Sequence, residues 1–182
     1  MALGHVTYEL ERVVFFVENG NYVPVSFQPQ TPQPIRDAVE GWVQQCILES
    51  ALVHLRNVAE FLVNQRPTRK ATRTDIVADH YFQVGWEKRP NYVLGHNRRE
   101  HDRLVKQIHR RVAHLSSQRL SVQRSGPFDW LPYVQTQFPP ALAAFRCFLD
   151  DLEKTHPRRC HWFERADLIL TSAGFPTSRP HA

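Results

Sequence analysis

The stretch LGHNRREHDRLVKQIHRRVAHLSSQRLSVQ, residues 94–123, combines the apolar spacing of a helix with concentrated positive charge. From Arg98 to Arg124 the chain has eight basic residues and two acidic ones, whereas the whole chain has 23 Lys and Arg against 18 Asp and Glu. Four of the ten histidines lie in the same stretch. We therefore expect the chemistry of the protein to lie here and the rest of the chain to act as its scaffold.

A helix over about residues 97–119 would divide this stretch into two sides, because each residue advances about 100° around the axis. One side is an apolar stripe of the width that a core-facing helix needs: Leu104, Val105, Ile108, Val112 and Leu115. His101 falls inside this stripe and is predicted to be a buried histidine with local partners. The opposite side carries Arg99, Arg103, Lys106, Gln107, Arg110 and His114, with His109 on the flank.

The exposed side of this helix has a residue pair suited to phosphate chemistry. Arg110 is the i−4 neighbour of His114, so both side chains can act on one group. Arginine can hold phosphate oxygens bidentately, and a histidine titrates near neutral pH and can transfer protons. With RNA, the substrate's own 2′-hydroxyl could be the nucleophile, and no metal would be required. The alternative interpretation is a solvated basic face that happens to carry one histidine.

The N-terminal part of the chain is predicted to be a β-hairpin followed by a long helix. Residues 13–27 place β-branched and aromatic runs around Asn19-Gly20, a pair that readily takes the geometry of a tight turn. Three prolines in residues 28–34 predict a stiff connector. Residues 35–64 have apolar positions at spacings of three and four, which predicts one long amphipathic helix.

The remaining segments complete a helical bundle. Residues 75–82 are predicted to be a short helix, and a further helix is expected to begin at Pro139-Pro140 and reach about residue 154. The apolar residues between 162 and 170 add a last short packing element. The expected fold is mainly α: a bundle of about four main helices over residues 35–170, preceded by a hairpin extension over residues 1–27 and the connector, and followed by a loose tail over residues 171–182.

Composition and motifs exclude several classes of protein. No apolar run approaches the roughly 20 residues that a membrane span requires, and the N-terminus lacks the pattern of a secretion signal. We therefore expect a cytoplasmic protein with no membrane association. Cys46, Cys147 and Cys160 form no CxxC pair and are predicted to be reduced core residues.

Metal and cofactor sites are not expected from the motifs. Three histidine pairs are spaced by five residues, which on a helix separates their side chains by about 140°. No HExxH motif, Cys/His cluster with ligand spacing, GxSxG motif or glycine-rich phosphate loop is present. These absences argue against a catalytic metal, a covalent hydrolase and a nucleotide triphosphatase, and no cofactor is predicted.

Three segments together resemble the HEPN superfamily, in particular its uncharacterised bacterial members. They are ESALVHLRNVAEFL (49–62), DIVADHYF (75–82) and IHRRVAHL (108–115), with Arg119 behind the last. HEPN domains are all-α bundles that commonly dimerise, and many are metal-independent ribonucleases, notably of toxin–antitoxin and antiphage systems. Their signature is an Arg, usually followed by a polar residue, with a His five to seven positions after that Arg.

Carried over onto this chain, the signature histidine is His114. Arg110 stands four positions before it, and positions five to seven before it are His109, Ile108 and Gln107. Arg103 precedes His109 by six, but about 120° around the helix from it. The resemblance implies that Arg110 anchors the scissile phosphate and that His114 is the acid/base, with a set of phosphate-binding and supporting residues around them: Arg99, Arg103, Lys106, Arg111 and Arg119 for phosphate, and Glu49, Arg56, Asn57, Gln107 and His109 in support.

Two alternatives stay open at this point. Glu49, Arg56 and Asn57 lie near one face of the long helix and form either an ion-paired surface strip or a strip that faces the central helix and orients its site residues. The protein is expected either to bind, and by the resemblance to cleave, RNA as a homodimer, or to act as a non-catalytic bundle that contacts a protein partner such as an antitoxin or a regulatory target.

Overall fold

The fold is built from helices throughout the part of the chain that the structure, a computed structural model, describes, namely residues 2–19, 25–65, 76–112, 130–156 and 161–176. The elements in chain order are α1 (Ala2–Asn19), α2 (Gln33–Val63), the 3₁₀ helix η2 (Ala78–Tyr81), α3 (Arg98–Val112), α5 (Trp130–Thr155) and α6 (His161–Ser172). No strand occurs in these ranges. The prediction of a mainly helical bundle is confirmed.

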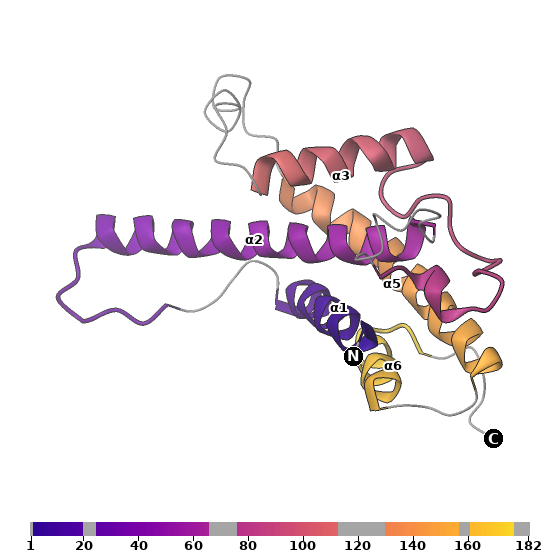
Figure 1. The fold of residues 1–182 in the computed structure, drawn as a ribbon. Coiled ribbons are helices and arrows are strands. Elements are labelled where there is room, and N and C mark those ends of the chain that lie inside the picture. The colour runs from indigo at the N-terminus through magenta and orange to yellow at the C-terminus, as the bar shows by residue number, and fades with distance from the viewer. Residues whose placement is uncertain (1, 20–24, 66–75, 113–129, 157–160, 177–182) are drawn as a thin grey trace.

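The long helix α2 is the centre of the bundle. It contacts α1, α3, α5 and η2, while α6 packs against α1 and α5. In Figure 1, α3 lies along one side of α2 and α1 lies on the other. Its bounds agree with the predicted helix over residues 35–64, and Pro34 lies in its first turn, where a missing N–H costs little.

The predicted N-terminal hairpin is wrong. Residues 2–19 form α1, and its buried side chains follow helical spacing from the start of the chain: Leu3, Val6, Leu10, Val13 and Val14. The run VVFFV has high strand propensity, but packing of this stripe against α2 and α6 overrides it. The proposed turn at Asn19-Gly20 falls partly outside the described residues, since Gly20 is not among them.

Two further helices differ from expectation in their extent. The helix predicted to begin at Pro139 instead begins at Trp130, so both prolines lie inside α5. Proline normally ends a helix because it lacks a donor and its ring crowds the preceding turn. Here both prolines are exposed, and the buried residues on either side of them, Phe138 and Ala141, anchor α5 in the core. The element expected between residues 162 and 170 is the 12-residue helix α6, whereas the short helix expected at residues 75–82 is one 3₁₀ turn.

An aromatic cluster joins α2, η2 and α5. The ring of Phe148 on α5 lies 5.2 Å from that of Phe61 on α2 and 5.7 Å from that of Tyr81 on η2, measured between centroids. Trp86, in the segment that leads to α3, lies 5.5 Å from the same ring. Such pairs contribute about 0.5–1.5 kcal/mol each beyond the area they bury.

A buried carboxylate next to this cluster fixes the segment that leads to α3. Asp151 on α5 accepts hydrogen bonds from Trp86 Nε1 at 3.2 Å, Lys88 Nζ at 3.1 Å and Lys154 Nζ at 2.6 Å. Burial opposes ionisation of Asp151, but the hydrogen bonds from Lys154, Trp86 and Lys88 outweigh it and hold the pKa of its carboxyl group below the ordinary value. The start of α3 is thereby tied to α5.

Candidate functional site

The start of α3 is set by local hydrogen bonds. Asn97 Oδ1 accepts the backbone N–H of Glu100 at 2.9 Å, the interaction of an N-cap residue. Gly95 has φ +73°, and its N–H donates to Gln137 Oε1 on α5 at 2.8 Å. A Cβ at Gly95 would lie 2.5 Å from Glu100 Cγ, so the sequence needs glycine here. These contacts fix which side of α3 faces α2 and α5.

The buried side of α3 matches the described part of the predicted stripe, while the side chain of Val112 and the whole of Leu115 lie outside the described residues. Leu104 and Ile108 are buried, Val105 is partly buried, and His101 is only 2% exposed. His101 Nδ1 accepts the backbone N–H groups of Val93 at 3.5 Å and Leu94 at 3.2 Å, which places its proton on Nε2 in the neutral ring. Burial, and secondarily the charge of Arg98, lowers the pKa of His101. His101 is a structural histidine, as expected.

The state of His101 predicts how stability changes with pH. Because its pKa is lowered in the folded state, the unfolded chain takes up the proton first as the pH falls below about 6.5, so the free energy of unfolding should decrease toward pH 5. The variant His101→Gln should lose this contribution, and it should be less stable at pH 7 by about 1–3 kcal/mol. Urea unfolding followed by circular dichroism from pH 5 to pH 8 measures both effects.

The matched control is His96→Gln, which changes an exposed histidine near the start of α3. In this variant the free energy of unfolding should depend on pH as it does in the wild type. An identical decrease in wild type and His101→Gln would show that His101 is not the titrating group.

The opposite side of α3 is exposed and cationic. Arg99, Arg103, Lys106 and Arg110 are all exposed, as is Gln107. The two acidic residues of α3 pair with neighbouring arginines: Arg98 Nε lies 3.0 Å from Asp102 Oδ1, and Arg103 Nη2 lies 3.6 Å from Glu100 Oε1. Within the described ranges, Arg99, Lys106 and Arg110 have no acidic partner, so three cations remain on this side.

A guanidinium and an imidazole meet at the border of this face, between α2 and α3. Arg56 Nη1 donates to His109 Nδ1 at 3.2 Å, and Arg56 Nη2 donates to Asn57 Oδ1 at 3.0 Å. Arg56 Nε also lies 3.3 Å from Glu60 Oε2. Because arginine has no acceptor, His109 Nδ1 must be unprotonated for this bond to form. The arginine–histidine contact is therefore made between two helices.

The strip on α2 formed by Glu49, Arg56 and Asn57 has features of both arrangements that the sequence left open. Arg56 is ion-paired, as a surface strip would be, and it also faces α3 through His109. Glu49 lies almost two turns earlier and accepts a hydrogen bond from Gln45 Nε2 at 2.9 Å. The expected contact of this strip with Arg110 is not among the hydrogen bonds and ion pairs of the described residues.

Part of the predicted site lies outside the described residues. His114 and Arg119 are in this group, and of Arg111 only the backbone, in the last turn of α3, is described. Of the predicted catalytic pair, the structure therefore places Arg110 on the exposed side of α3 and leaves the position of His114 a prediction.

Sequence reasoning missed a second histidine contact and misplaced two cysteines. His54 Nδ1 on α2 lies 2.5 Å from Glu9 Oε2 on α1, and its ring lies edge-on to Tyr8. No sequence signal pointed to this pair, because Glu9 is 45 residues away in a segment expected to form part of a hairpin extension. Cys46 and Cys147 are exposed, so their prediction as core residues is wrong, while Cys160 lies outside the described residues.

Comparisons with known proteins give no relative for this chain: no family model, curated protein or solved structure matches it. In the described residues, no group of three or more His, Cys, Asp or Glu side chains is placed to hold a metal ion. None of the described helices has the length and apolar character needed to cross a membrane.

Proposed function

We propose that the protein binds RNA through the exposed side of α3 and that it acts as a HEPN-like, metal-independent endoribonuclease of a toxin or antiphage type. The observation that carries RNA binding is the division of α3 into a buried side and a side with exposed Arg99, Lys106 and Arg110. Phosphate contacts from Lys and Arg supply most of the sequence-independent affinity for nucleic acid. The buried side of α3 holds the helix in place. The cations on its other side are therefore fixed in position and can contact successive phosphates of a nucleic-acid backbone.

The proposed cleavage chemistry uses a guanidinium to hold the scissile phosphate and an imidazole to transfer protons. Arg110 and His114 take these roles by their spacing and by the resemblance to HEPN proteins. The Arg56–His109 contact at the border of the same face supports the proposal, because it orients an imidazole beside the basic side chains without a metal. RNA bound along α3 would pass next to this pair.

The binding proposal predicts a change in the salt dependence of affinity. Replacing Arg99, Lys106 and Arg110 with Gln removes three phosphate contacts. The slope of log K against log salt for single-stranded RNA should then become less steep by about 2, at roughly 0.7 per contact. Fluorescence anisotropy of a labelled RNA at several salt concentrations measures this slope.

A control variant removes positive charge elsewhere on the surface. Arg12 and Arg165 are exposed and lie on α1 and α6. Replacing these two with Gln should leave the slope nearly unchanged. Equal slopes for the control and the triple variant, or no RNA binding by the wild type at low salt, would contradict the proposal.

The cleavage proposal predicts that RNA is cut in the presence of a chelator and that His114→Ala slows cutting by about 10²–10⁴-fold, the usual contribution of general acid–base catalysis. His96→Ala, near the start of α3, should cut at the wild-type rate. Gel analysis of a labelled RNA gives the rates. Equal rates for wild type and His114→Ala would exclude His114 from this role, and absence of wild-type cleavage would leave RNA binding alone.

A second candidate function, protein–protein interaction, is favoured by the first half of α2. Every residue from 33 to 50 is exposed or only partly buried, and burial begins at Ala51. Trp42 is 71% exposed and Ile35 is 53% exposed. Figure 1 shows this half extending beyond the other helices. Exposed apolar surface of this kind is typical of an interaction site.

We propose a second copy of the chain as the partner for this surface. A groove of about 360 Å³ lies beside the helix, lined by Phe15 and Phe16 of α1 and by Trp42, Val43 and Ile47 of α2. In a two-fold contact each copy supplies both a groove and a Trp42 side chain to insert. Exposed Arg12 at the groove, with Asp37 and Glu40 on the helix, gives the surface both charge signs, so an antiparallel copy can meet opposite charges.

This proposal predicts that Trp42→Asp makes the protein monomeric. The side chain is exposed in the single chain, so the substitution should leave the folded helix content unchanged while placing a charge in the apolar contact. Light scattering coupled to size-exclusion chromatography gives the mass. Glu164→Gln changes an exposed residue of α6, away from this surface, and is the control that should keep the wild-type mass. A wild type that is monomeric at high concentration would contradict the dimer.

A further inference from the structure

An open pocket of about 640 Å³ lies where the end of α2 meets the start of α3. Its described lining includes Gln65 just after α2, the segment from Arg89 to Tyr92, and Arg98, the first residue of α3. This volume is in the range of small-molecule sites, roughly 300–1,000 Å³, and is several times what a single phosphate group occupies. Arg99, Lys106 and Arg110 of the cationic side of α3 are not among its described lining residues.

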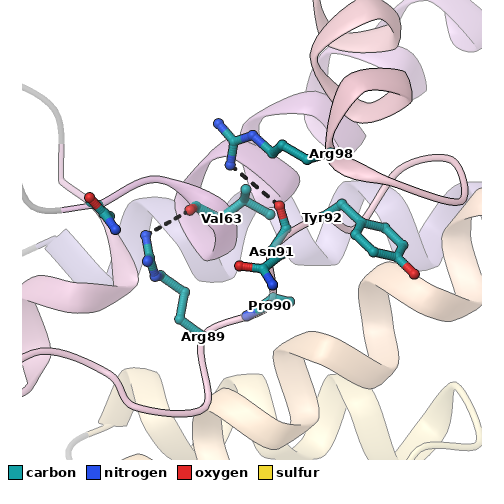
Figure 2. A pocket seen from close by; sticks show the side chains of 7 residues that line it. Val63, Arg89, Pro90, Asn91, Tyr92 and Arg98 are labelled. Carbon is teal, nitrogen blue, oxygen red and sulfur yellow. Dashed lines mark hydrogen bonds between the residues drawn. The ribbon is translucent and has the colours of Figure 1, made fainter.

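The lining chemistry favours an anion. Arg89 and Arg98 contribute two guanidinium groups, Gln65 and Asn91 contribute two carboxamides, and no described lining residue is acidic. Arg89 Nη1 donates to Val63 O at 3.0 Å, and Arg98 Nη1 donates to Asn91 O at 3.4 Å. Figure 2 shows both side chains reaching toward the end of α2 at Val63. These bonds use a minority of the five N–H donors of each arginine and hold both groups in place.

The other wall of the pocket differs in character. Tyr92 is 42% exposed and lines the pocket, and Figure 2 shows its ring directed away from the two guanidinium groups. The pocket is therefore lined by guanidinium groups on one side and by Tyr92 on another, and Gln65 and Asn91 add two carboxamides to the lining. Arginine pairs bind phosphate oxygens bidentately, tyrosine rings stack on nucleobases, and a carboxamide offers the donor and acceptor that a base edge requires.

We infer that this pocket binds a nucleotide with a terminal phosphate, the phosphate held by Arg89 and Arg98 and the base placed against Tyr92. The ligand can be a free mononucleotide or the 5′-phosphorylated end of an RNA, because both present the same chemistry to the pocket. Arg98 pairs with Asp102 through Nε and donates to Asn91 O through Nη1, which orients its guanidinium group and leaves Nη2 and the second N–H of Nη1 for the ligand. This site does not depend on the phosphate contacts proposed for Arg99, Lys106 and Arg110.

The test is calorimetric titration of the full chain with adenosine 5′-monophosphate, adenosine and inorganic phosphate. We expect the monophosphate to bind at least tenfold more tightly than either adenosine or inorganic phosphate. Equal affinity for adenosine would overturn the role of the arginines, equal affinity for inorganic phosphate would overturn the role of the base, and absence of binding by the monophosphate would overturn the site.

Substitutions then locate the site. Arg98→Gln should weaken binding of the monophosphate at least tenfold, and Tyr92→Ala should weaken it while leaving inorganic phosphate unaffected. Arg165→Gln removes one exposed, ion-paired arginine on α6 and should bind as the wild type does. Arg89 also donates a hydrogen bond to the last carbonyl of α2, that of Val63. The variant for testing Arg89 is therefore Arg89→Lys, which keeps a donor at this position, and circular dichroism checks its helix content. Wild-type affinity in Arg98→Gln, or an equal loss in Arg165→Gln, would contradict the inference.

Comparison of one dinucleotide with the mononucleotide distinguishes the two sources of the ligand. Tighter binding of 5′-phosphorylated diadenosine than of the monophosphate supports an RNA end, and the reverse order supports a free nucleotide. The triple variant of Arg99, Lys106 and Arg110 should bind the monophosphate normally. Loss of long-RNA binding with retained monophosphate binding would separate this pocket from the proposed RNA-binding side of α3.

Discussion

The contact of the Phe148 ring with the rings around it is the constraint on which the positions of the other elements depend. It joins the buried half of α2 through Phe61 and joins the segment before α3 through Tyr81 and Trp86. One turn of α5 later, Asp151 holds the same segment through Trp86 and Lys88. These contacts tie the segment that leads to α3 to α5, and the hydrogen bonds of Gly95 and Asn97 then set the start of α3 and the side that it exposes.

The helices with unbroken periodicity were predictable from the sequence. The apolar spacing predicted both ends of α2 and the start of α3 to within a few residues and placed His101 in the core, because such spacing depends only on residues close in sequence. The predicted end of the central helix, near residue 119, lies outside the described residues. The errors came where a local preference opposed a tertiary contact. The VVFFV run suggests a strand, but Leu3 and Val6 begin the buried stripe of α1 before that run starts. The pair Pro139-Pro140 suggests a helix start, but buried residues on both sides keep α5 continuous.

The candidate site was predictable only in part, for the same reason. Exposure of Arg99, Arg103, Lys106 and Arg110 follows from the wheel, and the structure confirms that exposure. The contact of Arg56 with His109 joins residues 53 apart, so it required the packing of α2 on α3 to be known. The pocket near Arg89 and Arg98 is likewise formed by the meeting of two helix ends, and nothing in the local sequence around either arginine signals a partner.

The division of α2 at Ala51 gives one continuous helix two different sources of stability. From Ala51 onward, α2 has eight buried side chains, so the backbone hydrogen bonds there are expected to open only when the bundle as a whole unfolds. From Gln33 to Ser50 no side chain is fully buried, although tertiary packing supplies most of the stability of helices in proteins. Amide hydrogens in the first half of α2 therefore exchange through local fraying, and those in the second half exchange through global unfolding. A partner that covers the first half would make the whole of α2 unfold as one cooperative unit.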